Sequence, residues 1–269
     1  MKFLIQKTTN NEVRHDFSFH LVEAIDYFKW YDPTYKIDYT YFEEDDTLDL
    51  FTEGNYIPVG SVEFVEDYFK FILNIKLKPL LIPESMLGSY YFIKRHMFYG
   101  TEEYLPLDKK MFVKSIDKTK TKDGTMIIMK HTVPEEFKNK FNDVFLPKGN
   151  YLFSEMIDIT SEWRGFVYKN KLVGLSNYSG DFTIFPDITF FYDVIKTMEQ
   201  YEIPAYTIDV GINKEGTFII ELHYFYSCGL YGFQDKRILP LMFRDTFEYL
   251  RIGKQMDDYT IYGKNKDNL

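Results

Sequence analysis

The sequence predicts an α+β protein, in which helices and strands follow one another in mixed order. Runs with apolar residues at helical spacing occur among shorter apolar or alternating runs that are typical of strands. In the C-terminal half the predicted strands come in pairs joined by short turns, such as the turn at Lys169-Asn170-Lys171. Hairpins of this kind pair antiparallel, so the pattern indicates α+β organisation and not a doubly wound parallel sheet.

The N-terminal third is expected to form a small α/β domain. Its predicted strands span residues 2–6, 35–42 and 57–62, and its predicted helices span 18–30 and 64–72. Pro79 and Pro83 then interrupt the pattern, and such prolines punctuate a chain between structural units. We therefore predict one domain over residues 1–82 and a second over 83–269, with subdomains of about 83–150 and 151–269.

The larger domain is expected to contain both element types throughout. Its predicted helices span residues 84–92, 133–144, 188–201 and 239–252. Its predicted strands span residues 111–115, 125–131, 151–157, 162–168, 172–178, 206–212 and 217–223. The last four strands form the two hairpins on which the functional prediction depends.

Composition and charge exclude several classes of protein. The chain has 41 acidic and 32 basic side chains, a net charge of −9, and an acidic surface repels a phosphate backbone, so long nucleic acid is not an expected partner. The single cysteine, Cys228, excludes a disulfide framework and a cysteine-based zinc site. The chain shows neither a signal-peptide core nor an apolar run of about 18 residues, so we expect a cytoplasmic protein without membrane contact.

The hairpin over residues 206–223 carries the strongest chemical signal. Side chains alternate along a strand, so Glu221 and His223 share one face, and Asp209 lies on the corresponding face of the partner strand. Folding the hairpin brings Asp209 opposite Glu221, within one residue of register. Two acids this close need a positive charge between them, and Mg²⁺ suits carboxylate oxygens. The alternative is a solvated polar strand face without a metal.

A second group of charged residues lies in and before the preceding hairpin. Glu155 closes one predicted strand, and Glu162 and Arg164 share a face of the next. Carboxylates accept hydrogen bonds from ribose or adenine, and the guanidinium of Arg164 suits a phosphate or a carboxylate. Lys114 ends a buried strand, where it is placed to meet a triphosphate. The alternatives are a Glu162–Arg164 pair on a solvated strand and a solvated loop after Lys114.

Taken together and in order, these residues resemble the motifs of the ATP-grasp superfamily. The residues that carry the resemblance are Lys114, Glu155, Glu162-Trp163-Arg164, Asp209 and Glu221-x-His223. The runs Ser161–Arg164 and Ile208–Gly211 are similar to the Ser-Glu-Trp-Arg and Ile-Asp-Val-Gly motifs of compact ATP-grasp proteins from bacteria and phages. The resemblance covers roughly residues 83–233. It implies an ATP-grasp fold with two α+β subdomains, and residues 1–82 would be the small domain that precedes this fold.

The resemblance also implies roles for individual residues. Phosphate contacts would come from Lys114 and Arg95, and Arg164 would face the phosphate or an acyl-phosphate intermediate. The adenine hinge would consist of Glu155, Met156 and Ile157, and Glu162 would bind the ribose. The ligands of Mg²⁺ would be Asp209, Glu221 and His223.

His223 departs from the pattern of the family, which usually has asparagine at this position. An amide oxygen is a hard ligand for Mg²⁺, whereas imidazole suits Mn²⁺ or Zn²⁺ better. Three consequences stay open at this point. The metal sphere is altered, a water replaces the amide, or catalysis is impaired.

The activity that the resemblance implies is ATP-dependent ligation of a carboxylate to an amine through an acyl-phosphate. The expected partners are ATP, a carboxylate substrate and an amine acceptor such as an amino acid, a peptide or a protein terminus. One alternative is a catalytically impaired nucleotide-binding module, for example a phage accessory protein in the host cytoplasm. Another is a nucleotidyltransferase, because Lys120–Thr125 is similar to a Lys-x-Asp-Gly signature, although Thr121 stands where the nucleophilic lysine belongs.

Overall fold

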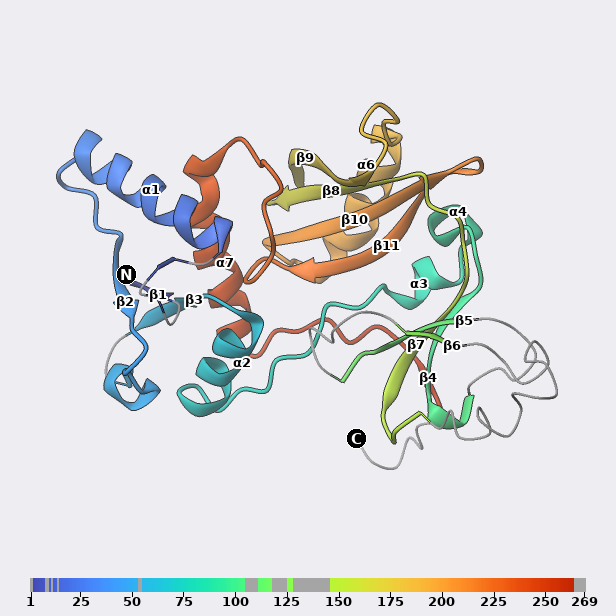
Figure 1. Cartoon of the computed structure of the whole chain (residues 1–269), viewed down its shortest axis with the longest axis horizontal. Helices are drawn as coiled ribbons and strands as arrows, with labels where there is room; N and C mark the ends of the chain where they lie inside the picture. Colours follow the sequence, from blue (N-terminus) through green and yellow to red (C-terminus); the bar gives the residue numbers. More distant parts are fainter. Residues whose placement is uncertain are drawn as a thin grey trace.

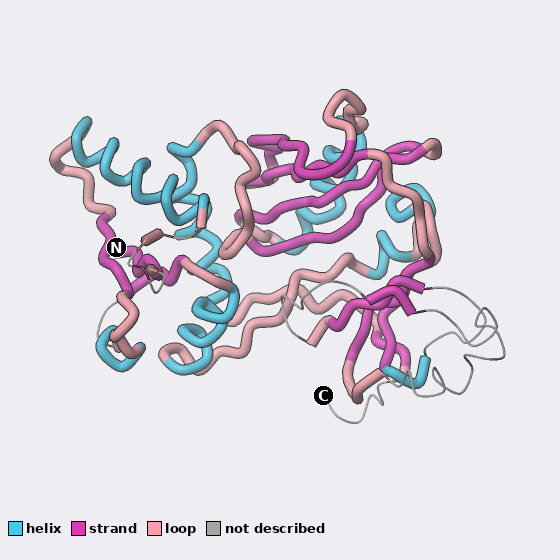
Figure 2. The backbone as a smooth tube through the Cα atoms, in the orientation of Figure 1, coloured by secondary structure: helices cyan, strands magenta, loops and turns pink. Residues whose placement is uncertain are grey.

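The computed structural model describes residues 2–7, 10, 12–13, 15–52, 55–104, 111–117, 125–127 and 146–263. These residues form three sheets (Figures 1 and 2). The predicted helix at 133–144 and most of the lysine-rich loop before residue 125 lie outside the described residues. No helix within the described ranges is long and apolar enough to cross a membrane.

The N-terminal sheet has three parallel strands in the order β2-β1-β3. Its elements are β1 (Lys2–Gln6), α1 (Asp16–Tyr31), β2 (Asp38–Phe42), the 3₁₀ turn η1 (Leu48–Phe51), β3 (Tyr56–Val59) and α2 (Val62–Phe71). The central strand β1 buries Phe3, Leu4 and Ile5 completely, as a strand covered on both faces requires. Helix α2 begins after Ser61, whose hydroxyl accepts a hydrogen bond from the backbone N–H of Phe64.

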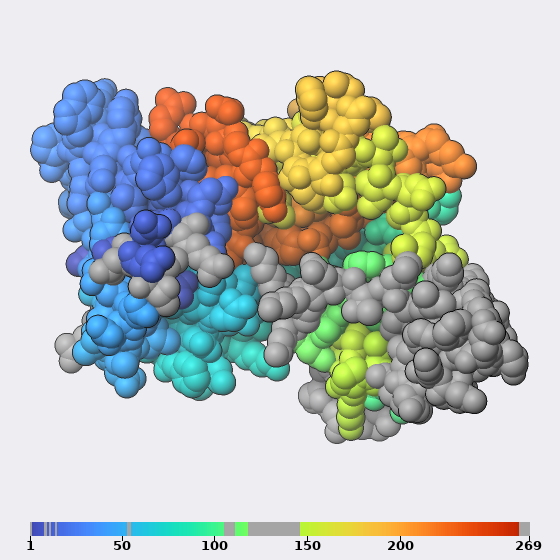
Figure 3. Space-filling view, in the orientation of Figure 1, coloured from blue at the N-terminus to red at the C-terminus, as the bar shows by residue number. Residues whose placement is uncertain are grey.

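The four-stranded sheet is antiparallel, with the order β11-β10-β8-β9. Its strands are β8 (Ser161–Tyr168), β9 (Lys171–Gly180), β10 (Ala205–Asn213) and β11 (Gly216–Tyr224). Helix α6 (Ile188–Met198), which η4 (Glu199–Tyr201) continues, covers this sheet with Phe190, Phe191 and Val194. Helix α7 (Leu239–Arg251), preceded by η5 (Lys236–Ile238), joins the sheet to the N-terminal part, and Figure 3 shows the two parts in contact.

The five-stranded sheet combines strands from the middle of the chain with one from its C-terminal end. The strand order is β12-β4-β7-β5-β6. The strands are β4 (Met97–Thr101), β5 (Met111–Ser115), β6 (Thr125–Ile127), β7 (Asn150–Glu155) and β12 (Ile261–Tyr262). The 3₁₀ turn η2 (Glu102–Tyr104) follows β4. The segment between α7 and β12 runs beside the segment before residue 84 (Figure 1). The Glu84 N–H donates to the Asp258 carbonyl at 3.0 Å.

Most predicted elements are present, and the differences have local causes. The helix expected at 84–92 is two short helices, α3 (Glu84–Leu87) and α4 (Tyr90–Ile93), because α3 ends at Gly88 and Ser89 is extended. The strand expected at 57–62 stops at Val59, since the backbone turns into the cap of α2. Strands β4 and β12 were not predicted, and β12 has only two residues, which pair with β4.

Candidate functional site

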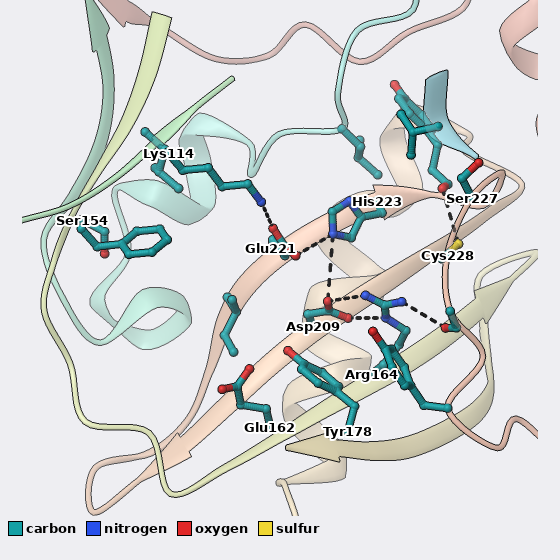
Figure 4. Close-up of a pocket in the computed structure, with 18 of the residues that line it drawn as sticks. Lys114, Ser154, Glu162, Arg164, Tyr178, Asp209, Glu221, His223, Ser227 and Cys228 are labelled. Atoms are coloured by element: carbon teal, nitrogen blue, oxygen red, sulfur yellow. Dashed lines mark hydrogen bonds and ion pairs between the residues drawn. The ribbon is translucent and has the colours of Figure 1, made fainter. Parts of the chain in front are cut away.

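A cavity of about 390 Å³ lies between the four-stranded and the five-stranded sheet. This size falls within the range of small-molecule sites. Seven of the predicted site residues line it: Arg95, Lys114, Glu162, Arg164, Asp209, Glu221 and His223. Figure 4 shows that Glu162, Arg164, Asp209, Glu221 and His223 come from strands of the four-stranded sheet, and that Lys114 reaches Glu221 from the five-stranded sheet. The predicted hinge residues Glu155, Met156 and Ile157 are not among the lining residues, and Met156 is half exposed.

The hairpin of β10 and β11 places Asp209 directly opposite Glu221, as the spacing predicted. Asp209 is only 1% exposed, so it is not a solvated residue on an open strand face. This burial rules out the alternative of a solvated face for Asp209. A register shift follows immediately after Asp209, which marks an irregularity of the ladder at the acid itself.

Arg164 and Asp209 form a buried ion pair across β8 and β10. Arg164 Nε donates to Oδ1 at 2.7 Å and Nη2 donates to Oδ2 at 2.6 Å, while Nη1 donates to the Gly229 carbonyl at 3.0 Å. Burial alone would lower the pKa of Arg164, but the carboxylate of Asp209 outweighs it and raises the pKa above its usual value. The guanidinium also lies over the ring of Tyr231, 4.9 Å from its centroid. Arg164 thus joins β8, β10 and the loop after β11.

A second charged cluster links the two sheets. Lys114 on β5 donates a short hydrogen bond to Glu221, and His223 Nε2 lies 2.8 Å from the other carboxylate oxygen of Glu221. Burial would raise the pKa of Glu221, but the charges and hydrogen bonds of His223 and Lys114 outweigh it and hold that pKa below its usual range. His223 Nε2 is also 4.0 Å from Asp209 Oδ2. The predicted phosphate ligand Lys114 therefore pairs with a predicted metal ligand.

Arg95 is the cation in the cavity that no described carboxylate pairs with. Its Nε donates to Ser154 Oγ at 2.8 Å, and Nη1 donates to the carbonyls of Ile93 and Ile219 at 2.8 and 3.1 Å. Burial lowers the pKa of Arg95 to about 10. A desolvated guanidinium held by neutral acceptors has an electrostatic preference for an anionic ligand, because a buried charge is stable only when it is paired.

Glu162 is an acid in the cavity that no described cation pairs with. It lies on β8 beside Tyr178, and no described lysine or arginine is within ion-pair distance of it. Burial, followed by the nearby carboxylates of Asp209 and Glu162, raises the pKa of Tyr178 above its usual value. Glu162 lines the cavity, where its carboxylate oxygens can accept hydrogen bonds from hydroxyl donors.

The donor set of the cavity fits a divalent cation. One ligand atom from each of Asp209, Glu221 and His223 lies within 4.8 Å of the others. Two carboxylates and one imidazole are ordinary ligands of divalent metals. Arg164 already donates to both oxygens of Asp209, but each carboxylate oxygen has a second lone pair. A cation at this position would replace the His223–Glu221 hydrogen bond.

Some lining residues were not predicted from the sequence. Ser154 and Tyr178 belong to this group. Tyr178 and Tyr231 stack on each other with centroids 5.1 Å apart, although they come from β9 and from the loop after β11. Alternation along β9 puts Tyr178 on a definite face, but no local pattern indicates its partner. The loop over residues 227–232 also lines the cavity, through Ser227, Cys228, Gly229 and Tyr231.

Comparison with known proteins supports the ATP-grasp fold that the sequence predicts. The family model described as "ATP-grasp domain, R2K clade family 2" matches residues 92–241, which is more than half of the chain. No curated protein matches by sequence.

Solved structures are similar over nearly the whole chain. D-alanine–D-alanine ligase from Bacillus anthracis matches with a TM-score of 0.53 and 10% identity, over 94% of this chain and 99% of that one. The same enzyme complexed with ATP matches with a TM-score of 0.51 and 12% identity, over 95% and 100%. D-cycloserine synthetase DcsG matches with a TM-score of 0.57 and 9% identity, over 93% and 100%. At such low identity these likenesses show the fold alone.

Proposed function

Because the chain belongs to the ATP-grasp domains of R2K clade family 2, we propose that it binds ATP in the cavity between its two larger sheets and uses it to join a carboxylate to an amine. One observation carries the proposal. Both the cations Arg95 and Lys114 and the acids Asp209 and Glu221 line the cavity, so groups that could hold phosphates and groups that could hold a cation border the same space.

In the proposed reaction the γ-phosphoryl group of ATP moves to a substrate carboxylate and gives an acyl-phosphate and ADP. The amine then attacks the acyl carbon, and phosphate leaves as the amide forms. Arg95 and Lys114 would hold the phosphates, and their charges would oppose the charge that develops during transfer. Glu162 would accept hydrogen bonds from the ribose. A divalent cation held by Asp209, Glu221 and His223 would supply further charge neutralisation.

The ion pairs in the structure add one requirement to this scheme. Lys114 donates to Glu221 with one of its three N–H groups, so it can also donate to a phosphate that lies beside Glu221. We infer that nucleotide and cation bind next to each other at this carboxylate, because Lys114 would hold the phosphate while the second oxygen of Glu221 is left for the cation. Asp209 and Gly229 take three of the five N–H donors of Arg164. The other two donors remain for its proposed contact with the transferred group.

We further propose that residues 1–82 form the domain that precedes the ATP-grasp domain at 83–269. Glu155, Met156 and Ile157 stay proposed as the adenine hinge, since Glu155 ends β7 and the other two residues follow it directly. The cytoplasmic location was predicted from the lack of a signal-peptide core and of a long apolar run, and the phage origin from the resemblance of the sequence; both stay predictions.

The test is ATP turnover by the purified chain. The protein is incubated with ATP, Mg²⁺ or Mn²⁺, and mixtures of amino acids and peptides, and ADP release is followed together with amide products by mass spectrometry. We expect product formation that Glu221→Gln abolishes, while Glu202→Gln, a surface pair with Lys254, leaves it unchanged. Absence of ADP release across the panel, with no effect of Asp209→Asn, would refute the proposal.

A nucleotide-binding module without turnover is the second candidate. It is favoured by the observation that Asp209 and Glu221 are already neutralised by Arg164 and Lys114. Calorimetry that detects ATP binding without ADP release would support it. The third candidate, a nucleotidyltransferase, concerns Lys120–Thr125, of which only Thr125 is described. A covalent AMP adduct on a lysine there would support that candidate.

A further inference from the structure

His223 is oriented as a nitrogen ligand toward the two acids. It follows Glu221 by two residues on β11, so both side chains lie on the same face, and its Nε2 points at both carboxylates (Figure 4). The neighbours Leu222 and Tyr224 are 2% and 3% exposed, and they anchor the strand in the core. The imidazole is therefore held at the acids and is not a mobile surface group.

Hydrogen bonds from Arg164 and Lys114 already engage most of the carboxylate oxygens of Asp209 and Glu221. Both oxygens of Asp209 accept hydrogen bonds from Arg164, and one oxygen of Glu221 accepts from Lys114. A cation that retains these ion pairs would take one oxygen from each acid, and the third atom within reach is the nitrogen of His223. The protein thus offers two oxygens and one nitrogen.

The nitrogen decides between metals of similar charge. Mg²⁺ demands oxygen ligands in a nearly ideal octahedron. Mn²⁺ accepts oxygen ligands equally well. It is also the first member of the divalent transition-metal series, whose ions bind imidazole nitrogen as well. We propose that the Asp209–Glu221–His223 site selects Mn²⁺ over Mg²⁺ and that His223 Nε2 coordinates the ion. This inference rests on the proposed nucleotide site and deepens it.

The experiment measures the metal directly and does not depend on turnover. Free Mn²⁺ is titrated by electron paramagnetic resonance in the presence of the full chain and a non-hydrolysable ATP analogue, and Mg²⁺ is added as competitor. We expect His223→Asn, which offers an amide oxygen instead, to lower the Mn²⁺/Mg²⁺ affinity ratio by about tenfold. The control His20→Asn, at a half-buried position on α1 that does not line the cavity, is expected to keep the ratio of the unmodified chain.

A spectroscopic signature separates coordination from a merely structural role. Pulsed resonance is expected to show a nitrogen coupling to bound Mn²⁺ that disappears in His223→Asn. An unchanged ratio, or a chain that binds Mn²⁺ without the nitrogen coupling, would overturn the proposal while the nucleotide site stands. Failure of the analogue itself to bind, measured by calorimetry in the same samples, would overturn the proposed function and this inference together.

Discussion

The buried pair of Arg164 and Asp209 supports a quantitative prediction about stability. Their side chains are 8% and 2% exposed, and two charge-assisted hydrogen bonds of 2.7 and 2.6 Å join them. Asp209→Asn removes the negative charge and leaves the guanidinium buried without a counter-charge. Breaking a buried pair from one side costs about 3–5 kcal/mol. We expect a loss near the lower end of that range, because the asparagine oxygen still accepts one hydrogen bond.

The measurement is urea unfolding followed by far-UV circular dichroism, with EDTA present so that metal binding does not contribute. The double variant Arg164→Met/Asp209→Asn removes both charges, and we expect it to lose less than the sum of the two single variants. Glu248→Gln breaks the exposed pair with Arg251 on α7 and should cost no more than about 1 kcal/mol. A loss below about 1 kcal/mol for Asp209→Asn, or additive effects in the double variant, would refute the reasoning.

Three further predictions concern other parts of the structure. Gly211→Ala should destabilise the chain by about 1–3 kcal/mol in the same urea assay, because its Cβ would lie 2.5 Å from Cζ of the buried Phe218. Lys114→Met should weaken binding of an ATP analogue by about tenfold in calorimetry, since one charged phosphate contact is lost, and should strengthen Mn²⁺ binding without nucleotide, since Glu221 is released. Asp245→Asn should lower the free energy of unfolding by about 1 kcal/mol at pH 7 and by less at pH 3.

The sign of the last effect follows from the groups around Asp245. Burial raises its pKa, but hydrogen bonds from Arg244 and Tyr168 outweigh burial and hold the pKa below its usual value. A depressed carboxyl pKa contributes stability above the unfolded value of about 4, and this contribution disappears as the pH falls through the folded pKa. An Asp245→Asn difference that grows toward low pH would contradict the assignment.

Each of the other two predictions has its own check. Gly88→Ala is the control for Gly211→Ala, because its added Cβ would meet nothing closer than a carbonyl oxygen at 3.5 Å. Equal stability loss in both variants would mean that the contact with Phe218 is not the cause. For Lys114→Met, an unchanged affinity for the analogue would show that Lys114 does not bind the phosphates.

The local part of the site could be predicted from the sequence. The short turn of the β10–β11 hairpin limits the register, so the Asp209–Glu221 pairing and the position of His223 follow from alternation along each strand. The pairing of Asp209 with Arg164 could not be predicted, because β8 and β10 are separated by β9 and α6 and no turn limits their register. The resemblance to the ATP-grasp motifs predicted that Arg164 and Asp209 belong to one site. It did not indicate that their charges neutralise each other.

Contacts between the sheets were also beyond local reasoning. The bond between Lys114 and Glu221 depends on how two separate sheets face each other, and side-chain alternation describes each sheet alone. The predicted strand of Lys114 was correct to the residue at 111–115. Strand β12 was missed because two residues are too few to show a periodic pattern. It is a strand only because it pairs with β4, and that contact cannot be read from the local sequence.

The position of β12 has a consequence for how the chain is made. Ribosomes release the chain from its N-terminus, so β4 is available long before Ile261 and Tyr262, which pair with its outer edge, have been synthesised. Until then the backbone donors and acceptors on that edge of β4 are open to other strands, including those of neighbouring nascent chains. The five-stranded sheet is therefore completed only after all of its other strands have been synthesised. Premature termination before residue 261 would leave a protein whose candidate site is encoded in full but whose sheet has an unprotected edge.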